Sequence, residues 1–317
     1  MNLSAHPVFA SLTPVFLLVA IGFMAGRLQW IRDAAIKDLS NLVFLLLIPA
    51  LLFRTMSAVR FEELDLRPLV AYFLAAGALL AVLIGWRGFN RSSVVLALTG
   101  VFSNMVMIGI TLVELAYGKA GLVTLLTLVS VHALLLLTTA TVVLELAVAR
   151  ENRQAGVEQP HLLATTWAAF KSALIHPVPL PIVCGLLFAQ TGWTLPTVID
   201  RPLQLLGNAF GPIALVLVGI TLARTPLTGH WQMALWATLS KNLVLPAMVG
   251  ISAWAFGITG LPLTVMVVTA ALPTGANVFL FAQRYEVAQE TTTASMGVST
   301  VAALFTLSLV MLIMSWM

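Results

Sequence analysis

The sequence predicts an all-α polytopic membrane protein of ten transmembrane helices, arranged as a five-plus-five inverted repeat. Hydrophobic residues make up 60% of the 317 positions, the mean hydropathy is +1.02, and only 9% of the residues are charged. Soluble domains carry about 25% charged residues. Apolar runs long enough to cross a bilayer alternate with short charged breaks. Two of these runs, in corresponding halves of the chain, are interrupted by polar, helix-breaking clusters.

The apolar runs define ten predicted spans. They cover 8–28, 37–58, 68–86, 92–116, 120–149, 173–191, 198–223, 231–256, 261–284 and 290–316. An even number of spans places both termini on one side of the membrane, and the positive-inside rule favours termini outside. The loops that are then inside hold Arg27, Arg32, Lys37, Arg87, Arg91, Arg150, Arg153, Lys171, Arg224 and Arg284, against Arg54, Arg60, Arg67, Lys119 and Arg201 outside.

The longest polar connection, 151–170, divides the chain into a first repeat, 1–150, and a second repeat, 171–317. Five spans in each half make the two halves enter the membrane from opposite sides. Matching features support this inverted repeat. The second span of each half contains an interior proline, Pro49 and Pro212, and the fourth contains an interrupted asparagine segment.

The interrupted segments read TGVFSNMVMIG (99–109) and ALPTGANVFLF (271–281). A broken helix at membrane depth leaves backbone donors and acceptors unpaired, so it persists only where protein encloses it or where it lines a cavity. One half-helix then presents N–H groups and the other presents carbonyls. An alternative is that the asparagines only join helices by hydrogen bonds. The candidate substrate-binding residues are Ser103, Asn104, Pro273, Thr274, Gly275, Ala276 and Asn277.

Three ionisable residues inside the spans are further candidates, because charge at membrane depth is costly. Lys241, deep in the eighth span, could neutralise a carboxylate substrate or stand in for a bound cation; a structural ion pair or a carbonyl-bonded lysine is the alternative. His132 could carry a coupling proton or be a packed neutral histidine. Glu114 is a second coupling candidate, unless it is solvated near the outer interface.

Other classes of function find little support in the sequence. Cys184 is the only cysteine, which excludes an intramolecular disulfide framework and cysteine-only metal clusters. The apolar stretches contain no HExxH spacing or catalytic constellation, so we expect neither an enzyme nor a cofactor. The net charge of +4 is explained by basic cytoplasmic loops rather than by a nucleic-acid partner.

Five motifs together resemble the auxin efflux carrier family, whose bacterial members include malate and malonate permeases. They are LSNLVFLLLIPALLF (39–53), SNMVMIGITLVELAYGKAG (103–121), LGNAFGPIALVLVGITLA (206–223), ALPTGANVFLFAQRY (271–285) and STVAALFTLSLVML (299–312). The resemblance covers essentially the whole chain. The crossover asparagines of the family match Asn104 and Asn277, and its crossover proline matches Pro273.

The resemblance implies an architecture related to bile-acid symporters and sodium/proton antiporters. Helices 1, 2, 6 and 7 would form a scaffold, and helices 3–5 and 8–10 a transport domain that carries substrate at the crossing of helices 4 and 9 by an elevator motion. A homodimer through helices 2 and 7 is also implied. Two departures are visible: the fourth span has no proline at its break, and the large loop of plant auxin exporters is absent. The second departure favours a metabolite permease of a bacterial inner membrane.

The leading hypothesis is a secondary transporter of small organic anions, such as malonate or malate, embedded in membrane lipid. A sodium/proton antiporter is the alternative, but it needs acidic residues at the crossing, and none of the Asp or Glu residues falls there. A Na⁺-coupled organic-anion symporter, with carbonyl and amide oxygens as Na⁺ ligands, stays open. A receptor or channel is a further alternative.

Overall fold

The computed structural model describes residues 7–60, 62, 64–155, 167, 178–225 and 231–316. These residues form helices joined by short turns, together with one isolated antiparallel bridge between Ser103 and Thr274. The predicted all-α class is therefore confirmed. Most of the predicted connection at 151–170 lies outside the described residues.

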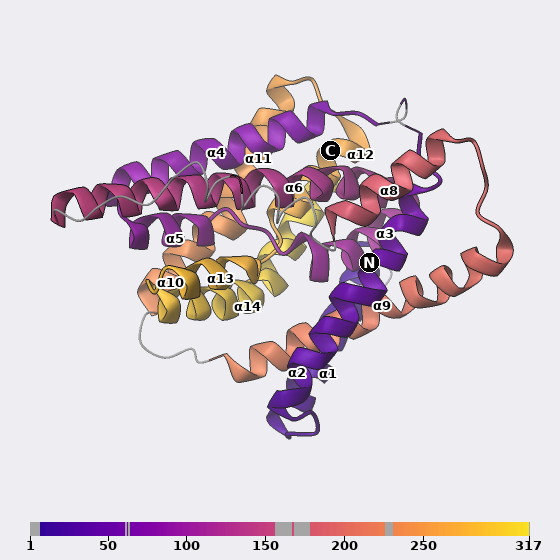
Figure 1. Cartoon of the computed structure of the whole chain (residues 1–317), viewed down its shortest axis with the longest axis horizontal. Coiled ribbons are helices and arrows are strands. Elements are labelled where there is room, and N and C mark those ends of the chain that lie inside the picture. The colour runs from indigo at the N-terminus through magenta and orange to yellow at the C-terminus, as the bar shows by residue number, and fades with distance from the viewer. Residues whose placement is uncertain are drawn as a thin grey trace. The chain divides into compact units, whose positions relative to one another are not determined.

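Helix is present in each of the ten predicted spans (Figure 1). The elements are α1 (Pro7–Arg27), α2 (Asp33–Leu42), the π-helical turn η2 (Val43–Leu47), α3 (Ile48–Met56), α4 (Arg67–Arg87), α5 (Arg91–Thr99), the π-helical turn η4 (Met105–Gly109), α6 (Ile110–Ala155), α8 (Pro179–Gln190), α9 (Thr197–Arg224), α10 (Trp231–Leu239), the π-helical turn η5 (Ser240–Val244), α11 (Leu245–Ala255), α12 (Gly260–Ala270), α13 (Asn277–Arg284) and α14 (Gln289–Met314).

Length and hydropathy identify the segments that can cross a membrane. Within the described residues these are Val8–Arg27, Ala34–Met56, Arg67–Arg87, Met105–His132, Thr197–Arg224, Trp231–Ala255 and Gln289–Met314, and α8 and α12 are shorter apolar helices. The chain is thus a polytopic membrane protein, while the full set of ten spans and the inverted repeat stay predictions.

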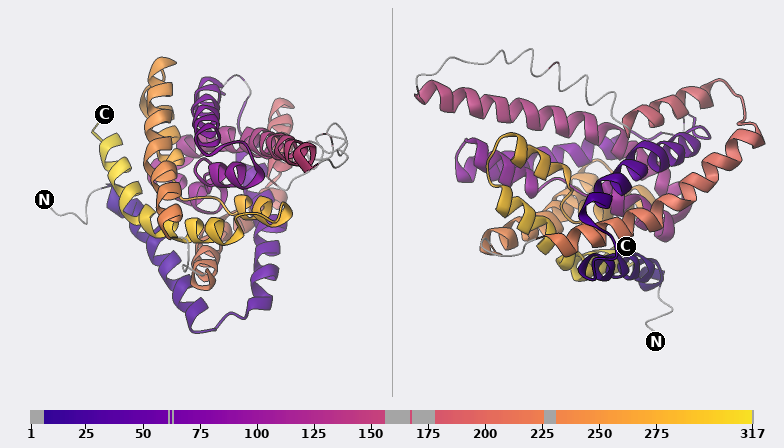
Figure 2. Two further views of the ribbon diagram at one scale, coloured as in Figure 1. Left: turned by 90° about the vertical axis from the view of Figure 1, so that its left-hand side faces the viewer. Right: turned by 60° about the horizontal axis from the view of Figure 1, so that its bottom comes forward.

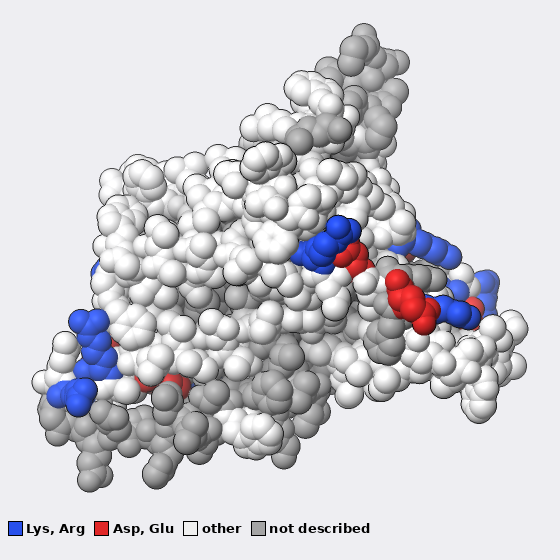
Figure 3. Space-filling view, turned by 90° about the horizontal axis from the view of Figure 1, so that it is seen from above, with Lys and Arg blue, Asp and Glu red and all other residues white. Residues whose placement is uncertain are grey.

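The outer surface has the character expected of a protein in lipid. Large apolar side chains are exposed on several helices, for example Leu17 on α1, Val82 on α4, Ile251 on α11 and Phe305 on α14. Among the residues coloured as described in Figure 3, most carry no charge. Such extended apolar exposure is unfavourable in water and favourable against hydrocarbon.

Local chemistry explains the irregular helix positions. The turns η2 and η5 end two positions before Pro49 and Pro246, which lack an N–H and displace the carbonyl four residues earlier. A π-helical turn accommodates that displaced group. Gly118 has a φ of 62° and divides α6 in two, between the predicted fourth and fifth spans.

The chain forms two compact units. Unit 1 comprises Met1–Leu66, Met105–Val131 and Ile175–Thr225, and unit 2 comprises Arg67–Asn104, His132–Leu174 and Pro226–Met317. Unit 1 therefore contains α1, α2, α3, α8 and α9, whereas unit 2 contains α4, α5 and α10 to α14. The helix α6 is shared, because the boundary at residue 131 falls within it.

Unit 1 is built around close contact between α1 and α9 (Figure 1). A Cβ atom added at Gly22 would lie 2.0 Å from the Val216 carbonyl oxygen, and one added at Gly219 would lie 2.0 Å from the Val19 carbonyl oxygen. The two backbones touch because each helix places a glycine against the other. This contact depends on the absence of both side chains.

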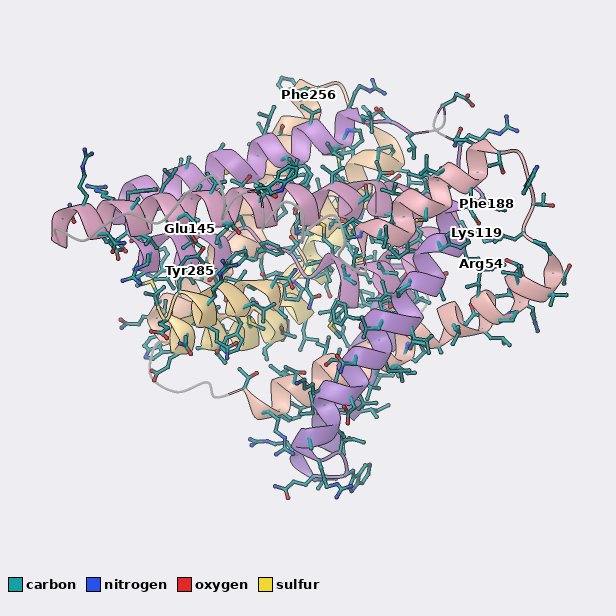
Figure 4. The ribbon with its side chains drawn as sticks, in the orientation of Figure 1. Arg54, Lys119, Glu145, Phe188, Phe256 and Tyr285 are labelled. Carbon is teal, nitrogen blue, oxygen red and sulfur yellow. The ribbon has the colours of Figure 1, made fainter. Side chains whose placement is uncertain are left out.

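A second contact within unit 1 is an ion pair between α3 and α9. The Arg54 guanidinium donates to both carboxylate oxygens of Asp200, at 2.6 and 3.1 Å. Arg54 is labelled in Figure 4. Both side chains are about one-third exposed, so the pair orients the helix ends more than it stabilises them.

In unit 2, α10 packs beside α14 and α4 packs beside α11 (Figures 1 and 2). Ser252 of α11 donates to the Ala71 carbonyl of α4 at 2.8 Å. Helices packed in this way surround the interrupted segments, whose residues are mostly buried.

Substituting Gly22→Ala should destabilise the protein by about 1–3 kcal/mol, because the new methyl group forces α1 and α9 apart. Gly77→Ala is the matched control, since a Cβ atom there meets nothing within 4 Å and alanine favours helix by about 1 kcal/mol. Thermal unfolding of the detergent-purified variants measures the difference. Equal melting temperatures for the two variants would contradict the glycine contact.

Candidate functional site

The two interrupted segments meet in unit 2 and pair through their backbones. The backbone N–H of Asn104 donates to the Pro273 carbonyl at 2.9 Å, and the backbone N–H of Gly275 donates to the Phe102 carbonyl at 2.8 Å. The bridge is antiparallel, and it satisfies backbone groups that each broken helix leaves without an intrahelical partner. The structure thus brings together the two segments that the sequence singled out.

The residue types at the bridge permit this close approach. A Cβ atom at Gly275 would lie 3.1 Å from the Ser103 carbonyl oxygen and 3.3 Å from the Phe102 ring, tighter than ordinary van der Waals contact. Pro273 has no N–H to leave unpaired and cannot continue α12. Gly100 follows the last residue of α5. These residues end the half-helices and allow the two segments to touch.

Thr274 connects the bridge to two neighbouring elements. Its hydroxyl donates to the Thr99 carbonyl at the end of α5, at 3.0 Å, and its amide donates to the Ser299 hydroxyl of α14, at 3.1 Å. The first contact satisfies a carbonyl at the C-terminal end of a half-helix. All of these groups are buried, so each bond replaces one that water cannot supply.

The side-chain ammonium of Lys241 lies at the C-terminal end of the other half-helix, α12. The lysine side chain is fully buried, and its ammonium donates to the carbonyls of Ala270 and Leu272, the latter at 2.7 Å. No carboxylate among the described residues forms an ion pair with it. The structure therefore shows a lysine bonded to backbone carbonyls, and its role as a substrate ligand or as a stand-in for a cation stays a prediction.

Tyr72 and His132 complete the surroundings of the bridge. The Tyr72 hydroxyl lies 3.1 Å from the Ser103 hydroxyl. The His132 ring packs edge-on against Phe102, with centroids 4.8 Å apart, and also contacts the rings of Tyr72 and Phe73. His132 is only 6% exposed, and both of its ring nitrogens lack a hydrogen-bond partner among the described residues.

The two predicted asparagines lie on opposite sides of the bridge. Asn104 comes directly after Ser103, and Asn277 begins α13, three residues after Thr274. Both are partly exposed, and Ala276 is exposed. Two amide side chains are therefore accessible beside the bridge.

Sequence reasoning missed three supporting residues. They are Tyr72, Asn242 and Ser299. The side-chain amide of Asn242 donates to the Ser299 carbonyl at 3.0 Å. Ser299 is the first residue of the motif STVAALFTLSLVML, and Asn242 follows Lys241. Both residues therefore lie within or next to positions that the sequence analysis names. Nothing in the local sequence distinguishes Tyr72.

Acidic side chains lie elsewhere. Glu114 is exposed and belongs to unit 1, so the structure does not place it among the bridge residues of unit 2. Glu145, on α6, is buried and accepts a 2.8 Å hydrogen bond from the Tyr285 hydroxyl; both residues are labelled in Figure 4. None of the described side chains bonded to the bridge is acidic.

Comparison with known proteins identifies the family. The family model described as "Membrane transport protein" matches residues 7–311. The chain belongs to this family, the auxin efflux carriers. The bridge lies within the matched range, in two of the segments that carry the resemblance in the sequence.

Three relatives cover nearly the same length as this family member. A protein of Rhizobium meliloti (strain 1021) named "Putative malonate transporter" is 27% identical over 303 residues, 93% of this chain and 92% of the relative. Auxin efflux carrier component 8 of Arabidopsis thaliana is 22% identical over 337 residues, 91% and 92% of the two chains. The uncharacterized transporter YfdV of Escherichia coli (strain K12) is 24% identical over 298 residues, 91% of each.

Substituting Ser299→Ala should lower the unfolding free energy by about 1–3 kcal/mol, because the buried Thr274 amide loses its acceptor. Ser308→Ala on the same helix is the control, since that hydroxyl is exposed and bonds only within its own helix. Melting temperatures in detergent compare the two. A Ser299→Ala protein as stable as the control would show that the amide finds another partner.

Proposed function

We propose that this carrier is a secondary transporter of small organic anions that binds its substrate at the crossing of the fourth and ninth spans. The bridge with asparagines on either side is the observation that carries the proposal. Asn104, Asn277, Ser103, Thr274 and nearby backbone amides are the proposed ligands. An amide side chain can donate to a carboxylate without a charge of its own that must be desolvated.

Malonate and malate are the first candidate substrates. The name of the Rhizobium relative refers to malonate, and a small dicarboxylate can accept hydrogen bonds from donors on both sides of the bridge. Auxin is less favoured, because the chain has no large central loop. The absence of an acidic residue from the described bridge contacts argues against sodium/proton exchange, which needs a carboxylate that alternately binds H⁺ and Na⁺.

His132 is the proposed proton carrier. Charging an imidazole among aromatic rings is unfavourable. An anionic substrate at the bridge would offset this cost. Proton and anion should therefore bind together, which makes the proposed transport an H⁺–anion symport.

The remaining features of the proposal rest on the resemblance to the family and on the charges of the loops. Spans 1, 2, 6 and 7 would act as the scaffold, and spans 3–5 and 8–10 would carry the substrate in an elevator motion, within a ten-span inverted repeat. We place the protein in a bacterial inner membrane with both termini outside, as a homodimer through the second and seventh spans (α2–α3 and α9). Catalysis and a cofactor have no part in this mechanism.

Uptake of radiolabelled malonate into proteoliposomes tests the substrate and its site. The wild type should show saturable uptake, and Asn277→Ala should lower it by at least about tenfold, because a hydrogen bond to a charged group is lost. Asn152→Ala, beyond the last predicted span of the first repeat, should transport normally. Saturable uptake that Asn277→Ala leaves unchanged would remove the crossing as the site. Absence of uptake by folded wild type would reject malonate.

The proposed role of His132 makes a separate prediction. An inward proton gradient should accelerate wild-type uptake, and His132→Phe, which keeps an aromatic ring against Phe102, should abolish that acceleration. The measurement compares initial uptake rates with and without the gradient, at clamped membrane potential. A His132→Phe protein that still responds to the gradient would assign the proton to another group.

A further inference from the structure

The C-terminal end of α12 offers a site for a cation. Carbonyls in the last turn of a helix lack intrahelical donors and carry the negative end of the helix dipole. The chain leaves the helix at Ala271, so the carbonyls of Ala270 and Leu272 converge on one point, the Lys241 ammonium. Carbonyl oxygens at the ends of broken helices are the groups with which transporters coordinate Na⁺.

The equivalent end of α5 is satisfied by a neutral group. There the Thr274 hydroxyl donates to the Thr99 carbonyl. Of these two helix ends, only that of α12 binds a positively charged group. A hydroxyl is sufficient for one carbonyl, whereas a pair of converging carbonyls provides the oxygen-rich environment that a cation requires.

The backbone holds Lys241 in this place. The turn η5 is π-helical, and its three consecutive residues Ser240, Lys241 and Asn242 are all buried. Asn242 anchors the turn through its bonds to the Ser299 carbonyl and the Thr306 hydroxyl on α14. The ammonium therefore cannot leave for solvent without a change in the surrounding packing.

The charge of Lys241 is balanced by dipoles rather than by an acid. No carboxylate pairs with it among the described residues, although an unpaired charge in a membrane protein interior is costly. The carbonyls and the helix dipole recover part of that cost. Such an arrangement places a positive charge where a bound monovalent cation would place one, with the difference that this charge is covalently attached to the chain.

We propose that the Lys241 ammonium is a resident cation that occupies the position of a coupling Na⁺ ion, so that the carrier neither binds nor requires Na⁺. Truncating the side chain leaves the two carbonyls unpaired and opens a site for a small monovalent cation. The transport consequence rests on the proposed function; the cation site does not.

Thermal unfolding of the purified full chain in NaCl or choline chloride, at equal ionic strength, tests the cation site without any substrate. Wild type and Lys37→Ala, which removes an exposed lysine, should melt at the same temperature in both salts. Lys241→Ala should be less stable in choline and should show a saturable rise in melting temperature with Na⁺. Lys241→Met fills the space without an ammonium and should gain no such response.

A saturable Na⁺ stabilisation of wild type, or a folded Lys241→Ala protein indifferent to Na⁺, would overturn the inference. If Lys241→Ala does not fold in either salt, the melting temperature of the wild type in the two salts tests the inference by itself. A protein with a vacant Na⁺ site melts at a higher temperature in Na⁺, whereas one with a resident ammonium does not.

Uptake in the same two salts tests the consequence for transport. Wild-type uptake should be equal in both, and Lys241→Ala should lose about tenfold in choline and recover in Na⁺. A Na⁺ requirement in wild type would reject the resident cation and leave anion transport standing. Lack of malonate uptake, combined with a melting response confined to Lys241→Ala, would reject the substrate and leave the resident cation standing.

Discussion

The structure depends on the pairing of backbone groups where two helices are broken inside the membrane. Each break frees N–H and C=O groups that lipid cannot satisfy. The two breaks pair with each other through the short bridge at Ser103 and Thr274. Side chains of unit 2 form hydrogen bonds with backbone groups that the bridge leaves unpaired. Because every such partner must be in place together, the bridge is specified by the whole unit.

The C-terminal ends of the half-helices α5 and α12 illustrate how the number of carbonyls that need a donor decides the choice of partner. Thr99 needs a single donor, and the neutral Thr274 hydroxyl supplies it without a charge to desolvate. The carbonyls of Ala270 and Leu272 converge, and the Lys241 ammonium satisfies both. A buried charge is tolerated there because the dipole end of α12 and two carbonyl oxygens replace its hydration.

The proposed selectivity for an anion would follow from the same arrangement. The described contacts of the bridge include a resident positive charge, an imidazole without partners and partly exposed amides, and they include no carboxylate. An anion placed among these groups gains hydrogen bonds and favourable charge interactions. In the proposed mechanism a metal cation would meet an ammonium already at the carbonyls, so the same groups would favour carboxylates and disfavour Na⁺.

The sequence alone determined the membrane class and the two breaks, because hydropathy and the backbone limits of Pro273 and Gly275 act locally. It also named His132 and Lys241, since charge at membrane depth is conspicuous in any apolar run. Only the tertiary structure decided which groups satisfy the breaks. Thr274 and its acceptor are 175 positions apart, and Tyr72 carries no local signal. Such partners are chosen by packing between distant helices, which a linear pattern does not encode.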